Sequence, residues 1–171
     1  DNMASDSATK LPTQQSVKAY ADTKATTSNR LDEFANPTSG LDINDQEVSK
    51  AILKDYAETD VVVTSGTTLT IDLSAGNTGS VTLGHSVTDI DFTNVPTNGT
   101  SSFTLKVTQD GTGSRTMAIN AITVNGGGDV TGLTAGAAGL TLSTGAADVD
   151  LVTFLFFDAG TPLINALLDF S

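Results

Sequence analysis

The sequence predicts an all-β fold, an antiparallel β-sandwich of jelly-roll type, preceded by an N-terminal helical stalk. Apolar and polar residues alternate in several short runs, which is the period of a strand with one buried face. From Asp60 onward, turn residues recur about every ten residues, a spacing typical of sandwiches and barrels. The links between runs are short and contain no helical crossover, so we expect antiparallel neighbours and about eight or nine strands, with a closed barrel as the rival architecture.

Composition and charge exclude several classes of partner. The 171 residues include 20 acidic and 8 basic side chains, for a net charge of −12. Such a charge repels nucleic-acid phosphates, so we expect no nucleic-acid partner. The chain has no cysteine, which rules out disulfides and thiolate metal sites. No run approaches the roughly 20 apolar residues of a membrane span, so we expect no membrane insertion.

A short helix is expected near the N-terminus. Thr13 is a suitable N-cap, and the residues from Gln14 to Ala21 are mostly good helix formers. A seven-residue frame continued through the next two turns places apolar side chains at both seam positions, with polar residues between them. This pattern fits one amphipathic helix lying on a neighbour, or a short parallel bundle between identical chains. The seam residues are candidates for an oligomer interface: Val17, Tyr20, Leu31 and Phe34.

The chain divides into a stalk region and a head. Residues 1–59 are expected to form a linker, the helical stalk and a connector, and residues 60–171 the head domain. A break is expected at Asn36–Gly40, because the residue before a proline resists helix. Leu41–Thr59 fits either a short helix beginning at Asp45 or an extended linker. Because the chain begins with Asp1, we expect it to be part of a longer protein or a processed product.

The clearest strand pattern is at Ser102–Asn120. Apolar and polar residues alternate through Phe103–Val107, and Asp110–Gly113 follows as a turn in which glycine permits positive φ. A second alternating run contains Met117 and Ile119. This arrangement predicts a β-hairpin.

The remaining strands are predicted from shorter runs. Val130–Gly145 is rich in small residues and is expected to be a long loop with one short strand. The continuous apolar run at Val149–Phe157 predicts a central strand, covered on both faces or on one face by another chain. The other expected strands are Val61–Val63, Leu69–Leu73, Ser80–Leu83, Val87–Phe92, Ile122–Val124 and Leu163–Phe170.

The last third of the sequence predicts self-association. Leu151–Phe157 and Leu163–Leu168 contain more apolar residues than the inner face of one small sandwich requires. The expected helix also has no partner within the sequence. Both features favour burial between copies of the chain, with Phe154 and Phe156 as further candidate interface residues.

Candidate catalytic and metal-binding residues are few. His85 is the single histidine, in a turn, and a lone histidine without cysteine does not make a zinc site. Asp89 with Asp91, and Asp148 with Asp150, could act as paired acids on a glycoside or bind calcium. In a chain this acidic, such pairs also suit the exposed face of a strand. The glycine-rich loops lack the lysine of a phosphate-binding loop. We therefore predict no catalytic residues, no cofactor and no metal, with a polysaccharide-degrading enzyme as a weaker alternative.

Several stretches resemble the tail-fibre and other fibrous virion proteins of tailed bacteriophages. The N-terminal segment resembles a part common to those proteins, and five later stretches resemble their C-terminal domains in the same order. The resemblance covers nearly the whole chain. The chain departs from the family at Ile119–Val124 and Pro162–Asn165, where the family commonly has tryptophan. The similar stretches are Asp1–Tyr20, Asp55–Thr59, Thr68–Asn77, Val107–Thr116, Asp150–Phe154 and Asp169–Ser171.

The resemblance implies a structural virion protein on the surface of the phage particle. It implies a homotrimer in which the helix is a stalk and the β domain a distal head for host attachment. The N-terminal side would bind other virion proteins, and the head a host surface glycan or protein. The main alternative is a capsid head fibre or decoration protein that stabilises the shell.

Overall fold

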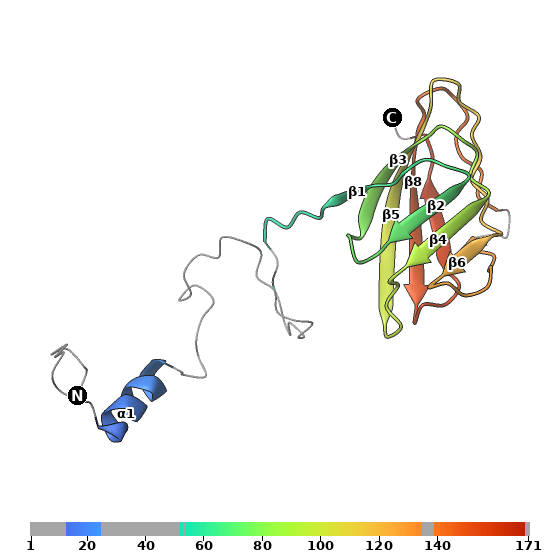
Figure 1. Ribbon diagram of the computed structural model, residues 1–171. Helices are drawn as coiled ribbons and strands as arrows, with labels where there is room; N and C mark the ends of the chain where they lie inside the picture. The colour runs from blue at the N-terminus through green and yellow to red at the C-terminus, as the bar shows by residue number, and fades with distance from the viewer. Residues whose placement is uncertain (1–12, 25–51, 53, 135–138, 170–171) are drawn as a thin grey trace. The chain divides into compact units, whose positions relative to one another are not determined.

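The computed structural model of the chain describes residues 13–24, 52, 54–134 and 139–169. The chain divides into two units, Asp1–Ile52 and Leu53–Ser171. Among the described residues, the first unit contains one helix, α1 (Gln14–Lys24), and the second contains nine strands (Figure 1). The stretch that includes Leu31, Phe34 and Asn36–Gly40 lies outside the described residues.

Helix α1 begins where the sequence predicts. The backbone N–H of Ser16 donates to Oγ1 of Thr13 at 3.1 Å, so Thr13 caps the first turn. Lys18 and Asp22, one turn apart, form an ion pair at 2.6 Å on the exposed surface. The predicted helix is confirmed, and it continues to Lys24. Among the described residues, no helix is long and apolar enough to cross a membrane.

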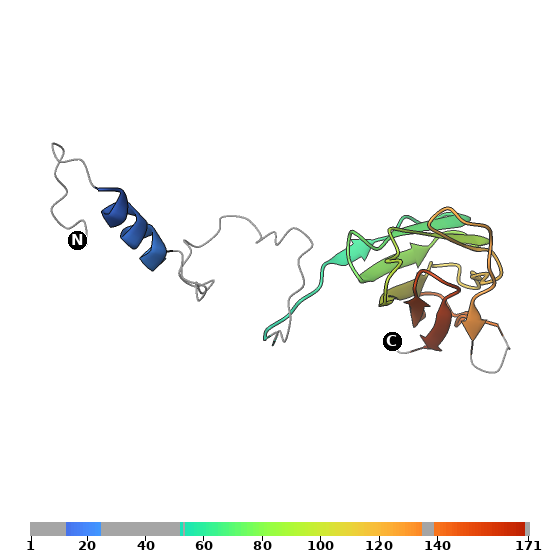
Figure 2. The same cartoon turned by 90° about the horizontal axis from the view of Figure 1, so that it is seen from below.

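The nine strands form two sheets. The six-stranded sheet has the order β1-β3-β5-β8-β9-β7, and the three-stranded sheet has the order β2-β4-β6. Strand β9 pairs with β7 at one edge of the larger sheet, and in Figure 2 the red C-terminal strands lie near the orange β7. The strand bounds are β1 (Asp60–Val62), β2 (Thr68–Asp72), β3 (Thr78–Leu83), β4 (Asp89–Thr93), β5 (Thr100–Gln109), β6 (Ile122–Val124), β7 (Leu133–Thr134), β8 (Val149–Phe157) and β9 (Leu163–Leu167).

The sheets are mixed and largely parallel, so the antiparallel jelly-roll prediction is wrong. From β1 to β6, successive strands alternate between the two sheets, and each pairs in parallel with the strand two places earlier. Antiparallel pairing joins β8 to β5 and to β9. The prediction failed because in–out alternation is the same for either strand direction. A strand of the opposite sheet supplies the crossover that parallel pairing requires.

The predicted hairpin at Ser102–Asn120 is also wrong. Strand β5 pairs with β3 and β8. At the end of β5 the side chain of Gln109 takes the place of a partner strand: its amide donates to the carbonyl of Arg115 and accepts from the N–H of Arg115, both at 2.9 Å. Beyond this point the chain turns away, and Met117 forms a parallel bridge with Val87.

The core lies between the two sheets. The ring of Phe92, on β4, lies 4.9 Å from the rings of both Phe154 and Phe156, on β8. Strand β8 is flanked by β5 and β9, which confirms the predicted central strand. The fully buried aromatic and aliphatic side chains of this core include Leu69, Ile71, Leu83, Ile90, Phe92, Phe103, Leu105, Ile122, Phe154 and Phe156.

A glycine inside β3 allows the close approach of two neighbours. A Cβ atom on Gly79 would stand 2.6 Å from the carbonyl oxygen of Val61 and 2.7 Å from Cζ of Phe103. Both distances are shorter than van der Waals contact. The position therefore requires glycine because the ring of Phe103 and the backbone of β1 occupy the space of a side chain.

Candidate interaction surface

The paired acids lie in different parts of the head. Asp89 and Asp91 point outward from β4, on the three-stranded sheet. Asp148 lies in the turn before β8 and accepts a hydrogen bond from the N–H of Gly145, whereas Asp150 points inward and is 1% exposed. Within the described ranges, no group of three or more histidine, cysteine or acidic residues is placed to hold a metal ion. His85 lies exposed in the bend after β3.

Asp150 and Gln109 form a buried polar cluster that holds three segments together. The carboxylate of Asp150 accepts from the N–H and the hydroxyl of Ser143, at 2.8 and 2.7 Å, and from the N–H of Asp169 at 2.9 Å. Gln109 donates to the carbonyl of Ser143 at 2.8 Å and also bonds Arg115. These hydrogen bonds satisfy the buried polar atoms of Gln109 and Asp150, so the role of the cluster is structural.

Arg115 forms an ion pair with Asp110. Nη2 of Arg115 lies 2.7 Å from Oδ2 of Asp110. The hydrogen bond from Arg115 is the main cause that lowers the pKa of Asp110; the backbone N–H groups of Thr112 and Gly113 lower it further, and partial removal from water opposes them. The pair fixes the loop that follows β5.

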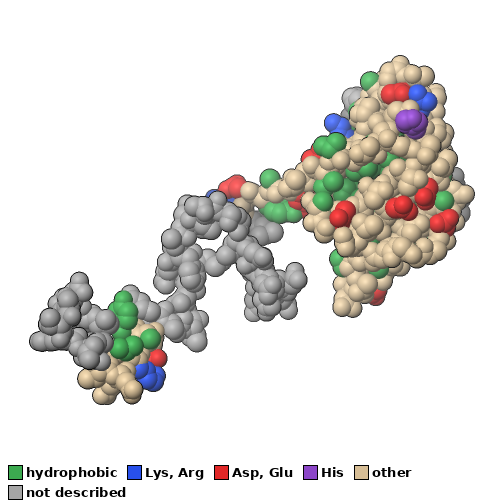
Figure 3. All heavy atoms as spheres, in the orientation of Figure 1, with side chains coloured by type: hydrophobic (Ala, Val, Ile, Leu, Met, Phe, Trp, Pro, Cys, Tyr) green, Lys and Arg blue, Asp and Glu red, His purple; other side chains and the backbone are tan. Residues whose placement is uncertain are grey.

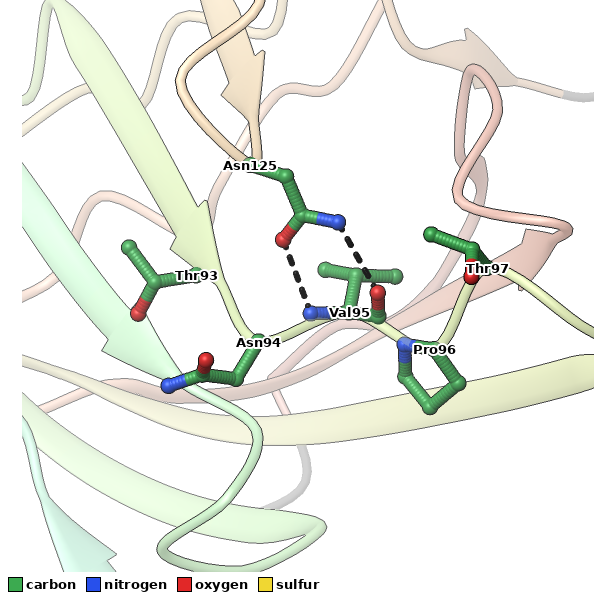
Figure 4. A pocket seen from close by; sticks show the side chains of 6 residues that line it. All are labelled: Thr93, Asn94, Val95, Pro96, Thr97 and Asn125. Carbon is green, nitrogen blue, oxygen red and sulfur yellow. Dashed lines mark hydrogen bonds between the residues drawn. The ribbon is translucent and has the colours of Figure 1, made fainter.

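A hollow in the surface lies beside the end of β4. Its walls are held by the side chain of Asn125, which accepts from the N–H of Val95 and donates to its carbonyl, both at 2.9 Å (Figure 4). The amide of Asn94 donates to Asp72 at 2.8 Å. Because these polar groups bond the loop itself, we assign the hollow no ligand. It is lined by Thr93, Asn94, Val95, Pro96, Thr97 and Asn125.

The outer side of the six-stranded sheet carries a row of large apolar side chains. Strand register places Leu163 beside Leu155 on one side and beside Leu133 on the other, and it places Leu151 opposite Leu167. Four of these side chains are exposed, from 41% for Leu163 to 58% for Leu167, whereas Leu151 and Leu155 are partly buried. We call this surface the apolar face; it consists of Leu133, Leu151, Leu155, Phe157, Leu163 and Leu167.

Charge is distributed unequally between the two outer surfaces. The outward positions of β3, β5, β8, β9 and β7 contain no acidic residue, and Lys106 on β5 is their one charged side chain. Lys106 lies opposite Leu151 in the strand register. The three-stranded sheet instead presents Asp72, Asp89 and Asp91 outward, where acidic side chains are visible over β2, β4 and β6 (Figure 3). On the outer side of the six-stranded sheet the acid is Asp60 on the edge strand β1, which accepts a hydrogen bond from the hydroxyl of Ser80 at 2.7 Å. The strands of the apolar face and the neighbouring β5 therefore present no acidic side chain outward.

The structure places the expected interface residues differently. Phe154 and Phe156 are 0% exposed, so they serve the core of this chain and present no surface to another one. On the described helix, Val17 and Tyr20 are 47% and 42% exposed. The outward positions that alternate with the two phenylalanines are Leu155 and its neighbours on β8. The sequence indicates an excess of apolar residues here, but a shift of one residue exchanges the two faces of a strand.

No protein-family model, no curated protein and no solved structure matches this chain. The candidate surface therefore rests on the chain's own side chains and strand pairing.

Proposed function

We propose that this chain is a structural virion protein of a tailed bacteriophage, a tail-fibre or spike subunit with an adhesive head and no enzymatic activity. The single observation that carries the proposal is the apolar face, because an exposed apolar surface of this kind in an acidic chain indicates burial in an assembly. The stretches that resemble phage fibres coincide with β2 and its turn, with the end of β5 and the Asp110 turn, and with β8.

The proposed assembly is a homotrimer on the surface of the phage particle. The head is a β-sandwich, its two sheets enclosing one core, and α1 belongs to the stalk. The N-terminal side binds other virion proteins, and the head binds a host surface glycan or protein. The face of the three-stranded sheet remains open to such a receptor when the apolar face is covered.

A mechanical role is supported by the way polar groups are used in the head. The Asp150–Gln109 cluster, the Asp110–Arg115 pair and the Asn125 side chain each fasten loops to the sheets. Fastened loops suit a domain that must display a surface under load. The three cases involve the loops after β5, before β8 and after β4.

Immunogold labelling tests the proposal. Phage particles from the source of the chain are labelled with antibodies raised against the purified protein and viewed by electron microscopy. We expect label at the tips of tail fibres or spikes. Label on the shell would instead support the capsid head-fibre or decoration protein, and particles without label would overturn both. Release of reducing ends from host polysaccharide by the purified protein would contradict the non-enzymatic part of the proposal.

A further inference from the structure

We infer that the apolar face is the surface through which copies of this chain pack against one another. Its large side chains form two rows: Leu133, Leu163 and Leu155 lie side by side across three strands, and Leu167 lies beside Leu151. The pair Thr153 and Asn165 lies between the two rows. An exposed apolar patch of several hundred Å² is the size at which a surface marks an interaction site. This inference rests on the self-association in the proposed function and adds the surface that performs it.

The dimensions suit a protein interface. The four neighbouring strands β5, β8, β9 and β7 have ten, nine, five and two residues, which gives their outer side a projected area of about 400 Å² at ordinary strand rise and spacing. A stable interface buries about 800 Å² of accessible surface on each partner. A pleated surface with protruding Leu and Phe side chains has more accessible area than its projection, so this side of the sheet supplies a large part of that area.

Charge identifies the occupant as a second copy of the chain. Each copy has a net charge of −12, so two copies that meet through the three-stranded sheet place Asp72, Asp89 and Asp91 near acids of the partner. In the larger sheet, the outward positions of β3, β5, β8, β9 and β7 contain no acidic residue. Lys106 adds a positive charge beside the apolar face. This is the arrangement that permits close contact between chains of the same negative charge. A basic partner, by contrast, would favour the opposite sheet.

The apolar face is surrounded by polar and acidic residues that limit its size. Acidic residues resume at the strand ends, with Asp158 after β8 and Asp169 after β9. Between Lys106 and these ends, the outward side chains of β5 are threonine and serine, which tolerate a half-buried contact. An apolar centre with a polar rim is the usual construction of a protein interface.

The first test compares two variants of the full chain by sedimentation equilibrium between about 1 and 100 µM. Leu167→Glu adds a charge to the apolar face, and Thr70→Glu adds the same charge at an exposed position of β2. We expect the wild type and Thr70→Glu to associate alike, and Leu167→Glu to weaken the association at least about tenfold. Circular dichroism spectra and thermal midpoints show whether the variants are folded.

A second measurement does not depend on a disruptive change. The chain has no cysteine, so a single thiol can be introduced at Asn165→Cys, in the middle of the face, or at Thr70→Cys as the matched control. We expect the thiol at position 165 to react with a maleimide at least about tenfold more slowly at high protein concentration than at low, because association covers it. The thiol at position 70 should react at one rate throughout.

The outcomes separate the two proposals. If the wild type associates while Leu167→Glu associates equally well and the thiol at position 165 stays reactive, the apolar face is not the interface, although self-association stands. If the wild type is monomeric at 100 µM, self-association and the assignment of this face are both overturned. Loss of association in the folded Leu167→Glu variant, together with protection of the thiol, supports the inference.

Discussion

Asp110 gives the head a specific acid sensitivity. Its pKa is lowered from the ordinary value of 3.8, chiefly by the hydrogen bond from Arg115, so the folded state favours the ionised carboxylate. A lowered folded pKa stabilises the fold above the unfolded pKa, and this stabilisation is lost as pH falls through the folded pKa. The contribution is therefore present at neutral pH and is lost progressively as the pH falls below about 4.

The Asp110→Asn variant tests this contribution. We expect its thermal midpoint to lie below that of the wild type at about pH 7, and the gap to narrow as pH falls from about 4 toward 2.5. Other carboxylates, such as Asp72, whose pKa the hydrogen bond from Asn94 lowers most, are present in both proteins and cancel in the difference. A gap that stays constant over this range would contradict the assignment.

Gly79 is a residue at which a single added methyl group should destabilise the head. We expect Gly79→Ala to destabilise the head by about 1–3 kcal/mol, because the added Cβ collides with the carbonyl of Val61 and the ring of Phe103. Gly111→Ala is the control: nothing lies within 4 Å of its Cβ position, so its effect should stay within about 0.5 kcal/mol. Urea unfolding measures both. Equal effects would show that the crowding at Gly79 is relieved at little cost.

Gln109 shows what the sequence predicts at single positions and what it does not. Every second residue of β5 from Phe103 onward is expected to point inward. Gln109 is at one of these inward positions and is 2% exposed. The polar side chain at an inward position was the available signal for a buried cluster. Its partner Ser143, which in turn donates to Asp150, lies far along the sequence, so no local pattern identifies these contacts.

At the scale of elements, β8 connects the two sheets through its inward side. We expect Phe154→Ala to lower the free energy of unfolding by about 3–5 kcal/mol, since it removes a fully buried ring that packs on Phe92. Thr153→Ala, on the outer side of the same strand, removes a hydrogen bond to Thr104 and should cost at most about 1 kcal/mol. Denaturant titration distinguishes them. Similar losses for the two variants would argue against a core between the sheets.

The positions of the strands were predictable, but their partners were not. Leu69–Leu73 and Val149–Phe157 alternate or run apolar in ways that local sequence determines, and β2 and β8 lie there. Pairing depends on which strands meet across the core and in which direction. The alternation of apolar and polar residues reveals neither the partner of a strand nor its direction. The Asp110–Gly113 turn resembles a hairpin turn, but the segment after it pairs elsewhere, with Met117 bridged to Val87.

At the scale of the whole molecule, association should strengthen with salt. Each copy has a net charge of −12, and the proposed interface is apolar, so added ions screen repulsion between chains without weakening the contact itself. We expect the dissociation constant to fall several-fold between about 20 and 300 mM NaCl, as measured by sedimentation. Weaker association at high salt would point to an interface held by ion pairs and would contradict the apolar face.

The candidate surface was predictable in region but not in residue. The apolar excess of Leu151–Phe157 and Leu163–Leu168 is visible in the sequence, and it indicates that something besides the inner face must be covered. The choice between Phe156 and its neighbour Leu155 needs the parity of β8, which its pairing with β5 sets. The distribution of acids between the two outer surfaces likewise follows from tertiary structure.

Strands β1 to β6 alternate between the two sheets, so this part of the head can fold strand by strand in the order in which it is synthesised. Asp60 pairs with Thr78, and Thr78 with Thr104, so each new strand finds its neighbour shortly after it leaves the ribosome. The far edge of β5 must wait for β8, since Thr100 pairs with Phe157. The last strands to arrive are also those that carry the apolar face. A nascent chain therefore presents the complete apolar face to its sister chains only when β8 and β9 have been added.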